Sequence, residues 1–111
     1  MVLQVGSFEE FKERLGYGER VICDHMLKAI KRGLSKNYNK VKVFAFEVED
    51  EPGVRYDFFL ESHQWPLTLE GILESYTREE LYELCQEVYD IIKNNPQINK
   101  LRQERFELTP K

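Results

Sequence analysis

The sequence predicts an α+β fold, in which an antiparallel β-hairpin, optionally joined by a third short strand, packs with four to five helices. Two neighbouring segments in the middle of the chain have the period of strands, and the segments on both sides have the period of helices. Strands and helices are therefore segregated along the chain, which favours an α+β fold over an alternating α/β fold. The length of 111 residues leaves room for one hydrophobic core, so we expect a single domain spanning residues 1–111.

The N-terminal part of the chain is expected to form a short strand and two helices. Residues 2–5 alternate weakly in polarity, which indicates an edge strand. Ser7 and Glu10 have the spacing of a capping box, and a short helix that begins there would end at Gly16 and Gly18. Beyond these glycines, apolar residues recur at helical spacing and predict a longer helix with a basic outer face. Its apolar stripe consists of Ile22, Cys23, Met26, Leu27, Ile30 and Leu34.

Two strands joined by a tight turn follow a polar loop at residues 35–40. Both alternate sets of residues 41–49 carry apolar side chains, so we expect this strand to be covered on both faces. Pro52 and Gly53 suit a type II turn, and residues 54–61 alternate like a strand with one core face. The resulting antiparallel hairpin needs covering helices or a third strand for stability. That strand could come from residues 2–5, from residues 67–69 or from a second copy of the chain.

The C-terminal part is predicted to be helical. Thr68 suits the cap of a helix that runs to Tyr76. Thr77 and Glu80 have capping-box spacing and would open the most regular helix of the chain, which ends before Pro96. Its apolar stripe consists of Leu81, Leu84, Cys85, Val88, Ile91 and Ile92. A further helix carrying Ile98 and Leu101, and docking of Phe106 and Leu108, are expected beyond it.

The composition limits the class of protein. The chain has 16 Lys plus Arg, 20 Asp plus Glu, a formal net charge of -4 and 41% hydrophobic residues, which is typical of an ordered domain. No apolar run approaches the ~18 residues needed to span a bilayer, and the start lacks a signal-peptide pattern. We therefore expect a cytoplasmic protein with no membrane partner. Cys23 and Cys85 form no CxxC motif and no Cys/His cluster, so we expect two reduced thiols and no metal site, with a disulfide only if the fold brings their Cα atoms within about 7 Å. We also expect no cofactor.

Two groups of residues resemble parts of a catalytic site. Cys23, Asp24 and His25 are consecutive on a predicted helix, so their side chains diverge by about 100° per residue and do not converge on a reacting atom. Glu61 and His63 follow the second strand, where functional loops often lie. A metal site would need three or four converging ligands, and the chain has two histidines. Both groups are therefore interpreted as structural.

Two further side chains are expected to serve the core. Trp65 would fill the interior beside Pro66. Cys85 lies at the centre of an apolar stripe, where desolvation raises the pKa of a thiol and makes it inert. A small enzyme that combines Glu61 and His63 with a cysteine remains an alternative hypothesis.

Charge is segregated along the chain, and this is the clearest indication of a binding surface. Residues 28–42 contain six basic residues and no acidic one, whereas residues 47–90 contain 13 acidic and two basic residues. Fields of either sign can steer a charged partner. The candidate partner-binding residues are Lys28, Lys31, Arg32, Lys36, Tyr38 and Lys40 in the basic segment, and Glu83, Glu87 and Asp90 on an acidic helix face.

These observations lead to one leading hypothesis and two alternatives. We expect a non-catalytic module that binds or regulates another protein and that self-associates, because no catalytic set converges and the hairpin is under-sized. Opposite patches on two copies would meet across a twofold axis in a homodimer. The alternatives are a nucleic-acid-binding protein that uses the basic segment and the small enzyme. A sequence pI near 5.3 disfavours nucleic acid.

Overall fold

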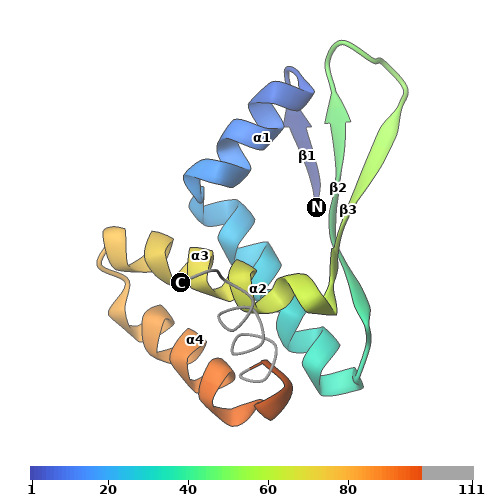
Figure 1. Ribbon diagram of the computed structural model, residues 1–111. Coiled ribbons are helices and arrows are strands. Elements are labelled where there is room, and N and C mark those ends of the chain that lie inside the picture. Colours follow the sequence, from blue (N-terminus) through green and yellow to red (C-terminus); the bar gives the residue numbers. More distant parts are fainter. Residues whose placement is uncertain (99–111) are drawn as a thin grey trace, which may run out of the picture.

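Residues 1–98 are described by the computed structural model, and they form a three-stranded sheet with helices packed on one side (Figure 1). The elements are β1 (Val2–Val5), α1 (Phe8–Tyr17), α2 (Arg20–Lys36), β2 (Lys40–Val48), β3 (Arg55–Glu61), the 3-10 helix η1 (Ser62–Gln64), α3 (Trp65–Arg78) and α4 (Tyr82–Asn94). The predicted α+β class is confirmed. No helix within these residues is long and apolar enough to cross a membrane. Leu101, Phe106 and Leu108 lie outside the described residues.

The sheet is mixed, whereas the sequence predicted an antiparallel hairpin with an optional strand of unstated direction. The strand order is β1-β2-β3, and β2 and β3 form the expected antiparallel pair. β1 joins β2 in parallel, with Val2 opposite Ala45 and Val5 opposite Val48. Residues 2–5 therefore supply the third strand, and residues 67–69 lie in α3. Because parallel neighbours need a crossover, α1 and α2 together form the connection from β1 to β2.

A β-bulge in β2 makes the expectation of two covered faces wrong. The register shifts between Lys42 and Phe44, which leaves Val43 as the extra residue. Val41 and Phe44 are three positions apart, and both are buried because the extra residue between them changes which positions of the strand face the core. On the opposite face Lys42 is exposed, and so is Phe59 of β3, whose exposed fraction is 41%. Apolar residues therefore occur at both odd and even positions of β2, because the inward-facing positions are odd before the bulge and even after it.

The core lies between the inner face of the sheet and the helices. Phe11 of α1 stacks on Phe46 of β2 with ring centroids 4.2 Å apart, and it meets Phe58 of β3 edge-on at 5.5 Å. Trp65 is buried as predicted. A Cβ at Gly33 would lie 2.7 Å from the Trp65 ring, so glycine at this position of α2 allows the indole to fill the core.

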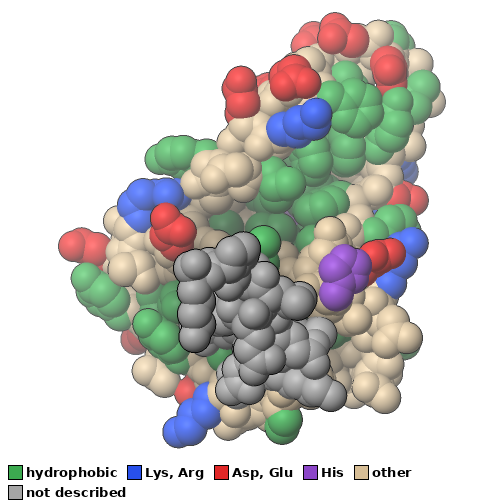
Figure 2. Space-filling view, viewed as in Figure 1, with side chains coloured by type: hydrophobic (Ala, Val, Ile, Leu, Met, Phe, Trp, Pro, Cys, Tyr) green, Lys and Arg blue, Asp and Glu red, His purple; other side chains and the backbone are tan. Residues whose placement is uncertain are grey.

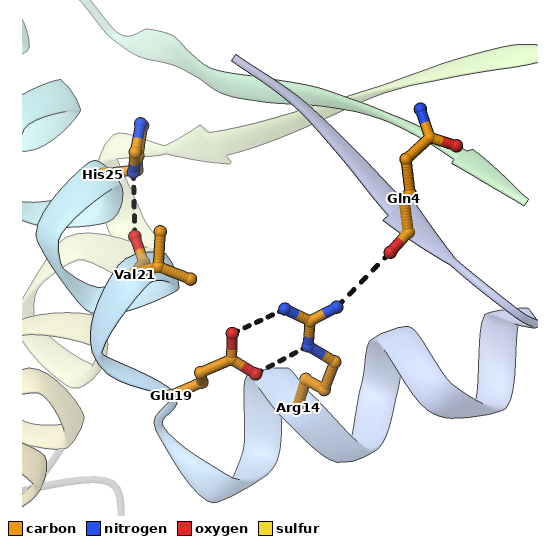
Figure 3. A network of polar contacts seen from close by, with 5 residues as sticks. All are labelled: Gln4, Arg14, Glu19, Val21 and His25. Atoms are coloured by element: carbon orange, nitrogen blue, oxygen red, sulfur yellow. Dashed lines mark hydrogen bonds and ion pairs between the residues drawn. The ribbon is translucent and has the colours of Figure 1, made fainter.

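The free edge of β1 is closed by a side chain of α1. The Nε and Nη2 atoms of Arg14 donate to the two carboxylate oxygens of Glu19, at 2.6 and 2.5 Å, and Nη1 donates to the Gln4 carbonyl at 3.4 Å (Figure 3). The hydrogen bonds from Arg14 lower the pKa of the Glu19 carboxyl. A backbone acceptor at the sheet edge is thus covered by a guanidinium that a carboxylate holds in place.

The start of α3 lies earlier than predicted. The helix begins at Trp65, directly after η1, and Pro66 occupies its first turn, where a missing N–H costs no helical hydrogen bond. Thr68 is therefore inside the helix, and its hydroxyl donates to the Gln64 carbonyl at 2.8 Å. The predicted cap at Thr68 is wrong because proline, with its fixed φ, already starts the helix.

The other helix ends include confirmed and wrong predictions. Ser7 caps α1 as expected, since its hydroxyl oxygen accepts from the Glu10 N–H at 3.1 Å. The capping box at Thr77 and Glu80 does not form, because α3 continues to Arg78 and Glu80 adopts a left-handed φ of 60°. The apolar stripe of the last long helix is confirmed as buried or half-buried, and consists of Leu81, Leu84, Cys85, Val88, Ile91 and Ile92.

Candidate binding groove

A groove of about 670 Å³ lies between the end of α1, the inner face of β3 and α3. Its apolar lining side chains are Leu15, Met26, Phe58, Leu60, Leu67 and Ile72. Leu67 is 53% exposed, and Leu15 and Phe58 are half-buried, so part of this apolar surface is in contact with solvent. Figure 2 shows hydrophobic side chains gathered on this side of the molecule, below a tip that carries acidic side chains.

The end of α1 is fixed at the groove by α3. Gly18 ends α1 with a φ of 78°, and a Cβ at this position would lie 3.1 Å from the Cβ of Ser75. The Ser75 hydroxyl donates to the Gly18 carbonyl. Arg78 donates to the Tyr17 carbonyl at 2.8 Å, and its guanidinium lies 4.5 Å from the centroid of the Tyr17 ring. These contacts satisfy carbonyls that a helix end leaves free, and they join the two walls of the groove.

The rim of the groove is acidic. Glu70 and Glu74 of α3 border it together with the positively charged Arg78, so acidic residues outnumber basic ones at this rim. The groove therefore offers apolar contact together with a negative field.

Two uncharged polar side chains of the groove, those of Thr68 and Gln64, already have backbone partners. The Thr68 hydroxyl donates to the Gln64 carbonyl, and the Gln64 side-chain oxygen accepts from the Glu61 N–H at 2.8 Å. Small-molecule sites usually place several free polar groups so that they converge on the ligand. Because these two side chains are already paired, apolar contact and charge dominate what this groove can recognise.

Cys23 lies in the apolar stripe of α2 as predicted, but it also borders the groove, and nothing in the sequence indicated that position. Its side chain is 1% exposed, and its thiol donates to the Gly18 carbonyl at 3.5 Å. Burial raises the pKa of the Cys23 thiol, and this outweighs the lowering by a hydrogen bond with Ser75. None of the described residues that line the groove is a histidine. The thiol thus lies at a concave surface but has no imidazole beside it there, and a protonated, buried thiol is a weak nucleophile.

The two histidines lie in separate surroundings. Nδ1 of His25 is 2.8 Å from the Val21 carbonyl, within one turn of α2 (Figure 3). Nδ1 of His63 is 3.5 Å from a carboxylate oxygen of Glu61, and both side chains are more than half exposed. The pair Glu61 and His63 that sequence reasoning singled out is therefore real, but it lies on an exposed surface. Within residues 1–98, no group of three or more His, Cys, Asp or Glu side chains is placed to hold a metal ion.

Asp24 and Cys85 have structural partners. The buried Tyr76 hydroxyl donates to an oxygen of Asp24 at 2.5 Å, which joins α3 to α2. Burial, and then this hydrogen bond, raise the pKa of Tyr76. Cys85 is buried, and its sulfur lies 3.5 Å from the Thr77 hydroxyl oxygen.

The basic and acidic candidates meet within one chain. Lys31 of α2 forms an ion pair and hydrogen bond with Glu87 of α4, and both residues border a shallow depression together with Lys28. Glu87 also borders a second depression with Glu83 and Asp90. The two predicted patches are therefore neighbours on one surface, and part of their charge is neutralised internally.

The remaining basic candidates are dispersed. Arg32 donates to the Lys42 carbonyl at 2.7 Å, which ties α2 to β2. Lys36 ends α2, and Tyr38 follows it with 49% of its surface exposed. Lys40 lies on β2, with its ammonium 4.5 Å from the centroid of the Phe59 ring. Comparisons of the chain with protein-family models, with curated proteins and with solved structures found no match.

Proposed function

We propose that this chain is a protein-binding domain and that the groove between α1, β3 and α3 receives a partner segment rich in apolar and basic side chains. The observation that carries the proposal is the combination of a solvent-exposed apolar lining with an acidic rim. Exposed apolar surface bordered by charge is typical of protein interaction sites.

The lining favours a peptide segment as the occupant. Leu67 stands at the entrance with 53% of its surface exposed, and the half-buried Phe58 forms part of the opposite wall. A leucine or phenylalanine from the partner would cover both. The carboxylate of Glu74 would then attract a lysine or arginine residue that flanks the apolar side chains.

Peptide selection tests the proposal directly. A random phage-displayed peptide library is selected on the full chain, and enriched peptides are synthesised and titrated by calorimetry. We expect peptides that combine Leu, Ile, Phe or Met with Lys or Arg. Leu67→Glu should weaken their binding at least about tenfold, because it places a charge at the apolar entrance.

Tyr82→Glu is the matched control, because Tyr82 is 65% exposed on α4 and does not line the groove. It should leave peptide affinity unchanged. Absence of enrichment, or enriched peptides that bind Leu67→Glu as tightly as the wild-type chain, would contradict the proposed groove function.

A further inference from the structure

The outer edge of β3 is unpaired within the described chain. β2 is the one strand among residues 1–98 that pairs with β3, and Figure 1 shows β3 at the margin of the sheet. The Ser62 N–H donates to the Asn39 carbonyl at 2.8 Å, and bonded positions alternate along an antiparallel strand. The even-numbered residues of β3 therefore bond to β2. The odd-numbered residues, which are Arg55, Asp57, Phe59 and Glu61, direct their backbone groups toward the open edge, where the Glu61 N–H already donates to the Gln64 side chain.

We propose that a second copy of this chain pairs with the open edge of β3, antiparallel and centred on Phe58. This goes beyond the proposed groove function and does not depend on it. Two three-stranded sheets would then join into one continuous six-stranded sheet around a twofold axis. A twofold axis perpendicular to the sheet keeps the inner faces of the two copies on the same side. Directly opposite residues must then both be even-numbered or both be odd-numbered, so the axis passes through a residue that pairs with its own copy.

The charges on β3 match this register. Centring on Phe58 places Arg55 opposite the partner's Glu61, and by symmetry Glu61 opposite the partner's Arg55. On the inner face it places Tyr56 opposite the partner's Leu60. All seven residues of the strand are then paired, with two symmetric ion pairs on the outer face.

The neighbouring registers are disfavoured by like charges or by length. Centring on Asp57 would place that carboxylate opposite the partner's Asp57. Centring on Phe59 would place Asp57 opposite the partner's Glu61. Like charges directly opposite each other destabilise a strand pair. Centring on Tyr56 would pair only three residues of the strand, because the turn at Pro52 and Gly53 follows.

The same register covers apolar surface. Tyr56 and Phe58 are half-buried at the inner face of β3, and the strand of a second copy would extend the sheet beside them. Phe58 would lie at the twofold axis, and it also lines the groove of its own chain. The dimer therefore places two binding grooves side by side across the axis.

Charge reversal tests the register. The dimer is measured by sedimentation equilibrium of the full chain up to about 0.5 mM, a range that covers weak self-association. Arg55→Glu places a carboxylate opposite the partner's Glu61, and this repulsion occurs twice in the symmetric dimer. We therefore expect the dimer dissociation constant to rise about tenfold. Glu61→Arg should have the same effect, and the double variant Arg55→Glu/Glu61→Arg should return to within about threefold of the wild-type constant.

Rescue in the double variant reports contact between chains. Arg55 and Glu61 are six residues apart on one strand, about 20 Å, so they cannot pair within a chain. Arg55 also contacts Glu47 at 3.3 Å within its own chain, and Glu47→Gln removes that pair without changing the edge. This control should dimerise like the wild-type chain, and circular dichroism confirms that every variant is folded. A monomer at all concentrations, a dimer insensitive to Arg55→Glu, or no rescue in the double variant would each overturn the proposal.

Discussion

The two edges of one sheet end in different ways. At the β1 edge, Arg14 covers the Gln4 carbonyl and is itself held by two hydrogen bonds from its guanidinium to Glu19. At the β3 edge, Arg55 and Glu61 lie near the two ends of the strand, with their charged groups largely exposed. The first edge is closed by an intramolecular contact, whereas the second presents both signs of charge to an approaching strand.

The difference shows that the charged side chains near each edge determine whether that edge is covered within the chain or stays open. Proteins commonly protect an edge with charges that repel a second strand. A strand with a single sign of charge would repel its own copy. β3 instead begins with the basic Arg55 and ends with the acidic Glu61, so an antiparallel copy brings opposite charges together at both ends. The proposed association therefore depends on the order of the three charged residues on one strand, and not on the segregation of charge along the chain.

The largest expected effect separates the inner and outer sides of the sheet. Phe46 is buried against Phe11, and Phe46→Ala should lower the free energy of unfolding by about 3–5 kcal/mol. Phe59 is 41% exposed on the outer side of β3 and contacts Lys40, so Phe59→Ala should cost at most about 1 kcal/mol. Urea unfolding at low micromolar concentration measures both in the monomer. Equal losses would mean that the outer face is covered.

A smaller effect concerns the position of α1. Gly18→Ala should lower the free energy of unfolding by about 1–3 kcal/mol, because φ is 78° and the new Cβ would approach Ser75. Gly16 is a matched control within α1, since a Cβ there meets no atom within 4 Å. Gly16→Ala should raise stability by up to about 1 kcal/mol. Thermal unfolding of both variants checks the contrast, and a destabilised Gly16→Ala would contradict it.

The smallest effect concerns the closed edge and depends on pH. The pKa of Glu19 is lowered by its hydrogen bonds with Arg14, so ionised Glu19 stabilises the fold above its unfolded pKa of about 4.3. This stabilisation is lost as pH falls through the lower folded pKa. Glu19→Gln should therefore cost about 1 kcal/mol at pH 7 and much less near pH 3. Urea unfolding at both pH values tests this, and a difference that grew on acidification would contradict it.

Much of the fold follows from local patterns in the sequence. The order of elements, the cap at Ser7, the hairpin and the buried stripe around Cys85 are confirmed because each depends on neighbouring residues. The bulge at Val43 and the early start at Trp65 were missed. The first depends on pairing with β3, and in the second a proline overrides a plausible cap at Thr68.

The groove could not be predicted in the same way. Its walls come from segments that are about 60 positions apart, as the contacts of Arg78 with Tyr17 and of Ser75 with Gly18 show. Periodicity assigns Phe58 and Leu60 to an inner face but does not say which helix covers them. Sequence reasoning therefore placed the binding surface on charge runs, and part of that charge is paired internally between Lys31 and Glu87.

Backbone amide hydrogen exchange along β3 tests the central claim most directly. The amides of Arg55, Asp57 and Phe59 point toward the open edge, so in the monomer they should exchange far faster than their even-numbered neighbours. As the protein concentration rises, their protection should increase in proportion to the dimer fraction, while the amides of β1 stay unchanged. Protection of these three amides that is the same in dilute and concentrated protein would contradict the account.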